Sequence, residues 1–280
     1  MRELDVSVVR QAVREMCIEA NCLVSPDIFE ALEQCRSREA SAVGVHILEQ
    51  LLENARVAAA ERMPICQDTG LAVVFIRVGQ EVHFTGGDLA AAVNDGVRAG
   101  YRDGYLRKSV IRDPIDRINT GDNTPAVIHF DLVPGDEIVL TVAPKGFGSE
   151  NMSRIYMLKP ADGIDGVKEC VVRTVDEAGS NPCPPVIVGV GLGGNFEKAA
   201  FLAKKALLRP VGKFSDIPHL RKLEEELLES INRLGIGPQG LGGRTTALGV
   251  HIESFPTHIA GLPVAVNIGC HVTRHVTRNL

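Results

Sequence analysis

The chain has 280 residues, of which 45% are hydrophobic and 23% are charged, and its formal net charge at pH 7 is −5. This length provides ample material for a hydrophobic core, and the ordinary balance of apolar and charged residues argues against a disordered chain. The net negative charge excludes general nucleic-acid binding, which needs a basic footprint. It does not exclude small anionic ligands, because local arginines can hold them.

The start of the chain is amphipathic and carries acidic residues, which is unlike a signal peptide. No run approaches the ~18 apolar residues of a membrane-spanning helix. The seven cysteines are an odd number in a long chain, which does not indicate a disulfide framework. We therefore expect a cytoplasmic protein without a membrane or nucleic-acid partner, in which some cysteines are buried thiols and others hold metal.

The first sixty or so residues predict a helical layer. Ser25 and Pro26 are typical of a helix start, with serine as the cap and proline in the first turn. Apolar residues recur at helical spacing over residues 39–61, and Pro64 ends this stretch.

From Leu71 onward the pattern changes to short strand-like runs, punctuated by glycine and proline: LAVVFIRV, EVHF, AVIHFDLV and EIVLTVAP. Further helices are predicted over residues 88–106, 161–179, 195–209 and 219–234. Three more strands are expected in VIVGVG, ALGVHIES and PVAVNIGC. This mixture predicts an α/β (mixed α+β) fold. We expect a single domain over residues 1–280, with a helical N-terminal layer (1–62) and a mixed region (63–280) that carries three cysteine loops.

Three cysteines lie in turns rich in glycine and proline: Cys66 in PICQDTG, Cys183 in NPCPP and Cys270 in NIGCH. Their wide separation, and the lack of any C-x-x-C pair, is unlike a structural zinc site. Cys17 and Cys22 begin a ferredoxin-like C-x4-C spacing, but a serine stands where the next ligand would fall. Spacing alone favours three buried free thiols. The alternative is a [4Fe–4S] cluster with one open iron, which serves as a Lewis acid.

Two short motifs suggest other functions, and we reject both. Gly189, Gly191 and Gly194 form a G-x-G-x-x-G pattern between a strand and a helix, but the helix ends at Arg209 with no second apolar strand after it. We expect a tight strand-to-helix turn there. The run 68–70 matches the aspartic-protease signature, but those enzymes need two such carboxylates and the chain contains one copy.

Six segments in the same order resemble class I, iron–sulfur-dependent fumarate hydratases and the related L-tartrate dehydratases. These segments are PICQDTG, NTGDNTPAVIH, PKGFGSEN, NPCPPVIVGVGLGG, IGPQGLGG and PVAVNIGC. The likeness runs from about Cys66 to the end of the sequence and extends weakly into the helical N-terminus. In this family a cluster-binding region and a second region are either fused or made as separate subunits, and the chain resembles only the first. The resemblance therefore implies an α subunit.

The resemblance also implies roles for individual residues. Metal ligands of a [4Fe–4S] cluster with one open iron would be Cys66, Cys183 and Cys270. Catalytic roles beside the substrate or the open iron would fall to Gln67, Asp68 and His258. The substrate-binding residues would be Arg107, Lys145 and Gly148. A guanidinium such as that of Arg107 grips a carboxylate through two parallel hydrogen bonds.

Two further features stay open at this point. The polar turn NTGDN, with Asn119, Thr120, Asp122 and Asn123, either lines the site or is turn chemistry alone. Arg244 has no secure match in the family.

The function that follows is the α subunit of an iron–sulfur hydro-lyase interconverting malate and fumarate plus water. No base is evident in this sequence, so we expect a β subunit to supply the base and further substrate contacts, within a higher oligomer of αβ pairs. An L-tartrate dehydratase α subunit is the alternative, because tartrate differs from malate by one hydroxyl. An NAD-dependent oxidoreductase or a non-catalytic iron–sulfur protein is a more distant possibility.

Overall fold

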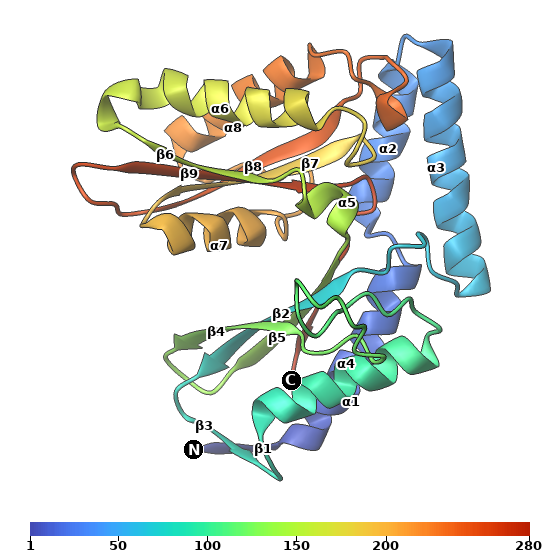
Figure 1. The fold of residues 1–280 in the computed structure, drawn as a ribbon, viewed down its shortest axis with the longest axis vertical. Helices are drawn as coiled ribbons and strands as arrows, with labels where there is room; N and C mark the ends of the chain where they lie inside the picture. The colour runs from blue at the N-terminus through green and yellow to red at the C-terminus, as the bar shows by residue number, and fades with distance from the viewer. The chain divides into compact units, whose positions relative to one another are not determined.

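The structure, a computed structural model, describes residues 1–280 (Figure 1). The chain folds into two compact units, and each unit is assembled from separate stretches of sequence. Unit 1 contains Met1–Val24, Ala55–Phe147 and Arg274–Leu280, and unit 2 contains Ser25–Asn54 and Gly148–Thr273. Both units combine helices with β-sheet, which confirms the expected mixed α/β class. The single domain expected over residues 1–280 stays a prediction.

Unit 1 contains a four-stranded sheet with the strand order β10-β5-β2-β4, and a separate parallel pair of β1 and β3. In the larger sheet β4 runs parallel to β2, whereas β5 is antiparallel to both β2 and β10. The strands are β1 (Arg2–Asp5), β2 (Leu71–Gly79), β3 (Val82–Thr85), β4 (Val127–Val133), β5 (Ile138–Lys145) and β10 (Val276–Asn279).

Two helices, α1 (Val6–Cys22) and α4 (Leu89–Asp103), supply the apolar residues that pack with this sheet into one hydrophobic core. Both begin at an aspartate whose carboxylate accepts a hydrogen bond from a first-turn amide. Gly96 and Gly100 allow the helices to approach closely, because a Cβ there would lie within 2.6 Å of the Arg10 carbonyl and 2.8 Å of the Arg14 carbonyl. The glycines of α4 thus determine how closely it packs on α1.

Unit 2 is built on a second four-stranded sheet, with the strand order β6-β9-β7-β8. Its strands are β6 (Arg154–Leu158), β7 (Val186–Gly193), β8 (Ala247–Phe255) and β9 (Leu262–Gly269). The helices that belong mainly to this unit are α2 (Pro26–Arg38), α5 (Phe147–Glu150), α6 (Gly163–Ala178), α7 (Phe196–Ala206) and α8 (Pro218–Asn232). Helix α3 (Ala42–Glu61) crosses the boundary between the units.

The helices of unit 2 form two layers around the sheet, with α6 and α8 on one face and α7 on the other (Figure 1). Apolar residues of α6, α8 and the sheet form the main core, and a smaller alanine-rich cluster lies under α7. Helix α2 contacts the edge strand β8. Both faces of β7 and β9 are therefore buried, which explains their continuous apolar sequences.

Most elements agree with the sequence prediction, since every expected strand is present and the expected helices shift only at their ends. Strands β1, β6 and β10 were not predicted, and β1 corrects the start of the expected helical layer (1–62). These three strands lie at sheet edges or in a two-stranded pair, so they lack a long apolar run. No helix in the structure combines the length and apolarity needed to cross a membrane.

The glycine motif after NPCPP has a packing role. A Cβ on Gly189 would lie 2.2 Å from the Ala203 carbonyl oxygen, and a Cβ on Gly191 would lie 2.0 Å from that of Ala199. These glycines allow the backbone of α7 to pack directly on β7. Gly193 and Gly194, with φ of +85° and +68°, form the turn between the two elements. The turn that we expected is present, and the close packing was not foreseen.

We predict that Gly191→Ala destabilises the protein by about 3 kcal/mol, because the added methyl group would overlap the backbone of α7. Urea unfolding followed by circular dichroism measures this change. Gly261→Ala is the matched control, since its Cβ would lie 3.9 Å from its nearest neighbours and should change stability by less than ~0.5 kcal/mol. Equal stability of the two variants would contradict the packing role.

Candidate functional site

The first cysteine loop belongs to unit 1 and leads into β2. The Cys66 sulfur accepts a hydrogen bond from the Asp68 amide over 3.4 Å and lies 3.3 Å from the Gln67 side-chain oxygen. Gly70 closes the loop with φ of +76°, and its Cα lies so close to the Lys145 backbone that a Cβ would be 2.7 Å from it. The loop is thus a tight turn that leaves the sulfur of Cys66 partly exposed.

Asp68 is held by three hydrogen bonds. Its carboxylate accepts one from the Gly70 amide over 3.1 Å and one from the Phe147 amide over 2.9 Å. Its backbone carbonyl accepts a third from the buried Arg274 guanidinium over 2.5 Å. The carboxylate therefore has a defined orientation, with one oxygen toward its own turn and the other toward the segment that enters α5.

Buried donors fix the next two residues of the same turn. The Tyr101 hydroxyl donates to the carbonyls of Thr69 and Gly70, at 2.7 and 2.9 Å. The Asn123 side chain donates to the Gly70 carbonyl over 3.1 Å and accepts from the Ser109 amide over 2.7 Å. Asn123 is fully buried, so this member of the polar turn stabilises the cysteine loop from behind.

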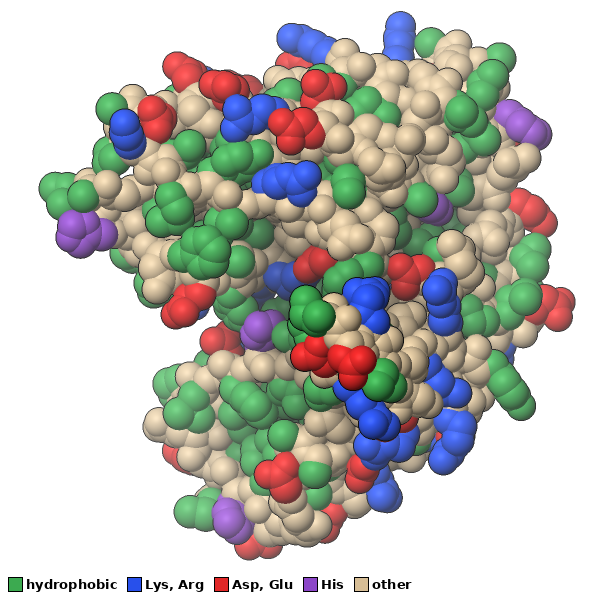
Figure 2. All heavy atoms as spheres, viewed as in Figure 1, with side chains coloured by type: hydrophobic (Ala, Val, Ile, Leu, Met, Phe, Trp, Pro, Cys, Tyr) green, Lys and Arg blue, Asp and Glu red, His purple; other side chains and the backbone are tan.

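The two basic residues of unit 1 that were predicted to bind substrate differ in exposure. Arg107 is exposed, and its backbone carbonyl accepts a hydrogen bond from the Thr69 hydroxyl over 2.9 Å. Lys145 is buried at the end of β5, where its ammonium donates to the Gly146 carbonyl over 3.3 Å. Figure 2 shows many Lys and Arg side chains on the surface of unit 1. Exposed cations in residues 102–117 are Arg102, Arg107, Lys108, Arg112 and Arg117.

The second and third cysteine loops meet in unit 2. Cys183 precedes β7 and Cys270 follows β9, and these strands are antiparallel neighbours with Ile187 opposite Gly269. The two loops therefore lie at the same end of the sheet. The residue after Cys270, His271, has its Nδ1 atom 3.0 Å and its amide nitrogen 3.4 Å from the Cys183 carbonyl oxygen.

The turn that presents Cys183 is fixed from a third segment. Cys183 is exposed and has φ of +55°, a conformation that non-glycine residues seldom adopt. The amide and the side chain of Gln239 donate to the Pro184 carbonyl, over 2.7 and 2.8 Å. The segment IGPQGLGG, one of the six that carry the resemblance, thus packs beside the second cysteine loop.

Gly148 begins a network that reaches the third cysteine loop. A Cβ on Gly148 would lie 3.6 Å from the Asn181 carbonyl oxygen, in the turn before Cys183. Two residues further on, the Glu150 carboxylate accepts a hydrogen bond from Asn267 over 2.9 Å and forms an ion pair with Lys204 of α7. Asn267 is three residues before Cys270. The Gly148 segment therefore lies beside the turn before Cys183 and is hydrogen-bonded to β9 close to Cys270.

The other four cysteines lie on helices α1, α2 and α6. Burial raises the pKa of Cys17 to about 12 and that of Cys170 to about 11. Burial also raises the pKa of Cys22 and Cys35. Because the thiolate is the form that binds metal, these four are poor ligands. The donor set of the three turn cysteines fits an iron–sulfur cluster better.

Comparison with known proteins shows the family of the chain. The sequence profile of the fumarate hydratase (Fumerase) family matches residues 10–279. The chain belongs to this family. It is 40% identical over 278 residues to the putative L(+)-tartrate dehydratase subunit alpha of Methanocaldococcus jannaschii, covering 97% of each chain. It is 36% identical over 255 residues to the L(+)-tartrate dehydratase subunit alpha of Escherichia coli UTI89, covering 90% of this chain and 84% of the relative.

The fumarate hydratase fold brings together some of the predicted site residues within each unit. In unit 1, Cys66, Gln67 and Asp68 share one turn, and Arg107 is bonded to it through its backbone. In unit 2 the structure gathers Cys183, Cys270 and Gly148. Neither unit alone gathers three His, Cys, Asp or Glu side chains that could hold a metal ion.

His258 is the predicted site residue that the fold does not bring near the others of unit 2. It lies in the exposed connection between β8 and β9, whereas Cys270 follows the other end of β9 (Leu262–Gly269). An eight-residue strand spans roughly 26 Å at ~3.3 Å per residue. No contact within unit 2 brings His258 and Cys270 together, and the role of His258 stays a prediction.

Arg244 lies in a loop that is held by a single acidic residue. The Glu39 carboxylate accepts hydrogen bonds from the amides of Arg244 and Thr245 and from the Thr245 hydroxyl, at 2.8–3.0 Å. Burial opposes ionisation of Glu39, but these hydrogen bonds outweigh it and lower the pKa of its carboxyl group. The Arg244 side chain itself is exposed, and none of these hydrogen bonds involves it.

Sequence reasoning missed three residues of the site, namely Tyr101, Gln239 and Arg274. Tyr101 and Arg274 are buried and bind backbone carbonyls, and nothing in their sequence surroundings distinguishes them from ordinary core or strand residues. Gln239 lies inside a segment that carried the resemblance, and its positive φ of 53° is the structural sign of a special turn.

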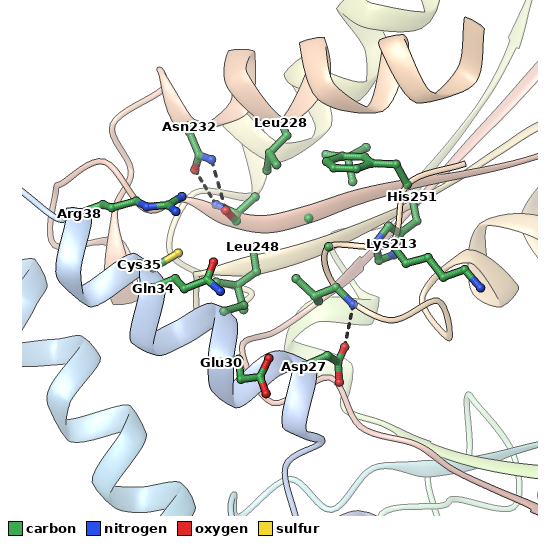
Figure 3. A pocket seen from close by; sticks show the side chains of 17 residues that line it. Asp27, Glu30, Gln34, Cys35, Arg38, Lys213, Leu228, Asn232, Leu248 and His251 are labelled. Carbon is green, nitrogen blue, oxygen red and sulfur yellow. Dashed lines mark hydrogen bonds between the residues drawn. The ribbon is translucent and has the colours of Figure 1, made fainter. Parts of the chain in front are cut away.

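A cavity of about 400 Å³ lies elsewhere in unit 2, between α2, β8 and the loop after α7 (Figure 3). None of the predicted site residues lines it. His251 is a buried lining residue whose Nδ1 lies 3.2 Å from the Ala206 carbonyl oxygen. Burial, assisted by the nearby Arg209, lowers the pKa of His251 to about 4. The imidazole is therefore neutral in the folded protein at physiological pH.

We predict that His251 makes stability fall with acidification. Unfolded His251 gains its proton near pH 6.5, whereas the folded residue resists protonation until about pH 4, so the free energy of unfolding falls between these values. The expected loss attributable to His251 is about 2 kcal/mol between pH 7 and pH 5. Urea unfolding at both pH values, for wild type and His251→Asn, measures it. The variant keeps a donor for Ala206 and should show a smaller loss; equal losses would contradict this assignment.

We predict that Tyr101→Phe destabilises unit 1 by about 1–3 kcal/mol, because it removes a buried donor from two carbonyl groups. Thermal or urea unfolding measures the change. Tyr105→Phe is the control, since Tyr105 is 93% exposed and its loss of a hydroxyl should be nearly neutral. A neutral Tyr101→Phe would show that the hydroxyl does not stabilise the cysteine loop.

Proposed function

We propose that this chain is the α subunit of a two-subunit hydro-lyase that interconverts malate and fumarate plus water. Membership of the fumarate hydratase family identifies the chain as part of a hydro-lyase. The observation that supports an iron–sulfur enzyme is the meeting of the Cys183 and Cys270 loops at one end of the unit 2 sheet. Cys66 would supply the third ligand from unit 1.

The proposed cofactor is a [4Fe–4S] cluster with one open iron, held by Cys66, Cys183 and Cys270. When bound, such a cluster supplies a Lewis acid for the departing hydroxyl group. All three sulfurs lie in turns and are at least partly exposed, whereas the helical cysteines are held as thiols. The amide of Asp68, which donates to the Cys66 sulfur, would stabilise negative charge on that ligand.

Substrate carboxylates would be bound by cationic and backbone donors of this chain. Arg107 is exposed, and its backbone is anchored beside Cys66, so its guanidinium could grip one carboxylate through two parallel hydrogen bonds. Gly148 presents backbone without a side chain beside the second cysteine loop. As the proton leaves carbon, negative charge builds on the neighbouring carboxylate, and such donors stabilise it.

Asp68 would orient its neighbours in the site rather than abstract the proton from the substrate. Both of its carboxylate oxygens accept backbone hydrogen bonds, which fix the direction of the carboxylate. We propose that it keeps Gln67 and the Cys66 turn in position for substrate. Lys145 would add positive charge behind the same turn, since its backbone lies against Gly70.

The proton acceptor is proposed to lie in a β subunit. The two relatives are named as alpha subunits, which supports a partner polypeptide for this chain as well. The side chains of Asp68 and Asn123 are engaged in backbone hydrogen bonds. The complete enzyme would then be an oligomer of αβ pairs.

L-tartrate dehydration is the second candidate function, and the names of both relatives favour it. Tartrate carries one more hydroxyl group than malate, so the same carboxylate donors could hold either molecule. A pocket that only accommodates an extra hydroxyl discriminates weakly, whereas one that hydrogen-bonds to it discriminates strongly. Relative rates with the two substrates decide between the candidates.

The first experiment reconstitutes the chain anaerobically with iron and sulfide and measures bound iron and visible absorption. We predict about four irons in wild type and their loss in Cys66→Ser, Cys183→Ser and Cys270→Ser. Cys17→Ser is the matched control and should keep its iron, because burial raises the pKa of Cys17 to about 12. A wild-type protein without bound iron would contradict the cofactor assignment.

The second measurement adds the β subunit and follows fumarate absorption with malate, and oxaloacetate formation with L-tartrate. We expect turnover only when both chains are present, because the base is proposed to lie in the partner. Full activity of the α chain alone would contradict that division. A cluster-loaded complex that turns over only tartrate would replace the malate assignment and leave the hydro-lyase class intact.

A further inference from the structure

Strand β4 (Val127–Val133) is an unpaired edge of the unit 1 sheet. It is hydrogen-bonded to β2 on one side only, since it ends the strand order β10-β5-β2-β4. Its side chains are unusually apolar for an exposed edge: Phe130 is 53% exposed and Leu132 is 72% exposed. Figure 2 shows hydrophobic side chains gathered on this part of unit 1. Exposed apolar edges of this kind tend to pair with another strand.

The apolar side chains of β4 continue the core of the sheet. Ile128, Phe130 and Leu132 lie in register with Val74, Ile76 and Val78 of β2, which belong to the core formed with α1 and α4. Ile128 packs against this core, whereas the next two extend beyond it. A strand added beside β4 would cover them on the same face.

The sequence of β4, VIHFDLV, is complementary to itself when read in the antiparallel direction about Phe130. In that register each His129 lies opposite Asp131 of a second copy, and each Ile128 lies opposite Leu132. Phe130 lies opposite its counterpart at the two-fold axis. Residues that face one another across an antiparallel pair share one side of the sheet, so the charged and apolar pairs separate onto opposite faces.

Two residues of β2, Phe75 and Arg77, lie beside the charged face of β4. His129 stacks on Phe75, with ring centroids 5.1 Å apart, and Arg77 lies in register with Asp131. In the paired arrangement each Asp131 would therefore lie between Arg77 of its own sheet and His129 of the second copy. His129 can serve as a donor either as an imidazolium or through a neutral ring N–H.

We propose that two copies of this chain associate through β4, forming a continuous antiparallel sheet with its two-fold axis at Phe130. The arrangement is isologous and closed, as in most dimers. Moving the axis by one residue would place Asp131 opposite Asp131, or His129 opposite His129, and like charges directly opposite are unfavourable. The charges thus select one register. This inference does not depend on the proposed reaction.

A strand from an unrelated partner, including the β subunit, is the competing occupant of this edge. Such a partner would need no symmetric placement of histidine and aspartate around Phe130. The self-complementary pattern, which satisfies two charged pairs at once, favours a second copy. Mixing two variants that carry opposite introduced charges distinguishes a second copy from an unrelated partner.

The test uses the 280-residue chain in sedimentation-velocity experiments over a range of concentrations. His129→Asp places Asp opposite Asp, and Asp131→Lys places Lys opposite His, so each variant alone should dimerise at least about tenfold more weakly than wild type. In a mixture of the two variants, the introduced aspartate faces the introduced lysine, and the unchanged Asp131 of one chain faces the unchanged His129 of the other. Mixing should therefore restore dimers. Wild type that remains monomeric, or a mixture that remains as weak as its parts, would overturn the proposal.

Cross-linking tests the register directly. Under mild oxidation Phe130→Cys should form a covalent dimer on a non-reducing gel, because the two thiols would face one another at the axis. Leu132→Cys is the matched control: it would face Ile128 of the second copy and should cross-link no more than wild type, which gives the background of the native cysteines. Equal cross-linking of the two variants, or cross-linking of neither, would overturn pairing about Phe130.

Discussion

The antiparallel pairing of β7 with β9 is the constraint on which the unit 2 site depends. Cys183 precedes β7 and Cys270 follows β9. Because these strands are antiparallel neighbours, their pairing alone places the two cysteines at one end of the sheet. The fit of α7 against the glycines of β7 keeps this sheet closely packed, and the Glu150–Asn267 hydrogen bond attaches the Gly148 segment to it. The geometry of the second and third cysteine loops follows from the sheet rather than from contacts between the loops alone.

In unit 1 the cysteine loop is held in place by hydrogen bonds rather than by strand pairing. This loop is a tight turn held by buried donors from a helix, a distant turn and the C-terminal segment: Tyr101, Asn123 and Arg274. Asp68 joins this turn to the segment that enters α5. This rigid backbone suits the proposed role of a subunit that positions substrate while a partner supplies the base.

Much of this organisation could be predicted. Period-two and helical patterns located the long strands and helices, and segments such as PICQDTG and NIGCH indicated the family that the sequence profile confirms. Edge strands such as β10 were missed because they have no long apolar run and are stabilised by their neighbours. The roles of Gln67, Arg107 and His258 stay predictions, and His258 lies at the far end of β9 from Cys270.

The sequence by itself determined the family, the mixed α/β class and the three cysteines that lie in turns, because these depend on local composition and on ordered motifs. Only the tertiary structure decided which residues support the site. Tyr101 and Arg274 act through long-range hydrogen bonds to carbonyl groups, and Gly191 acts through contact with a helix that the sequence places later. Such contacts depend on how strands pair and helices pack, and no local pattern of residues encodes them.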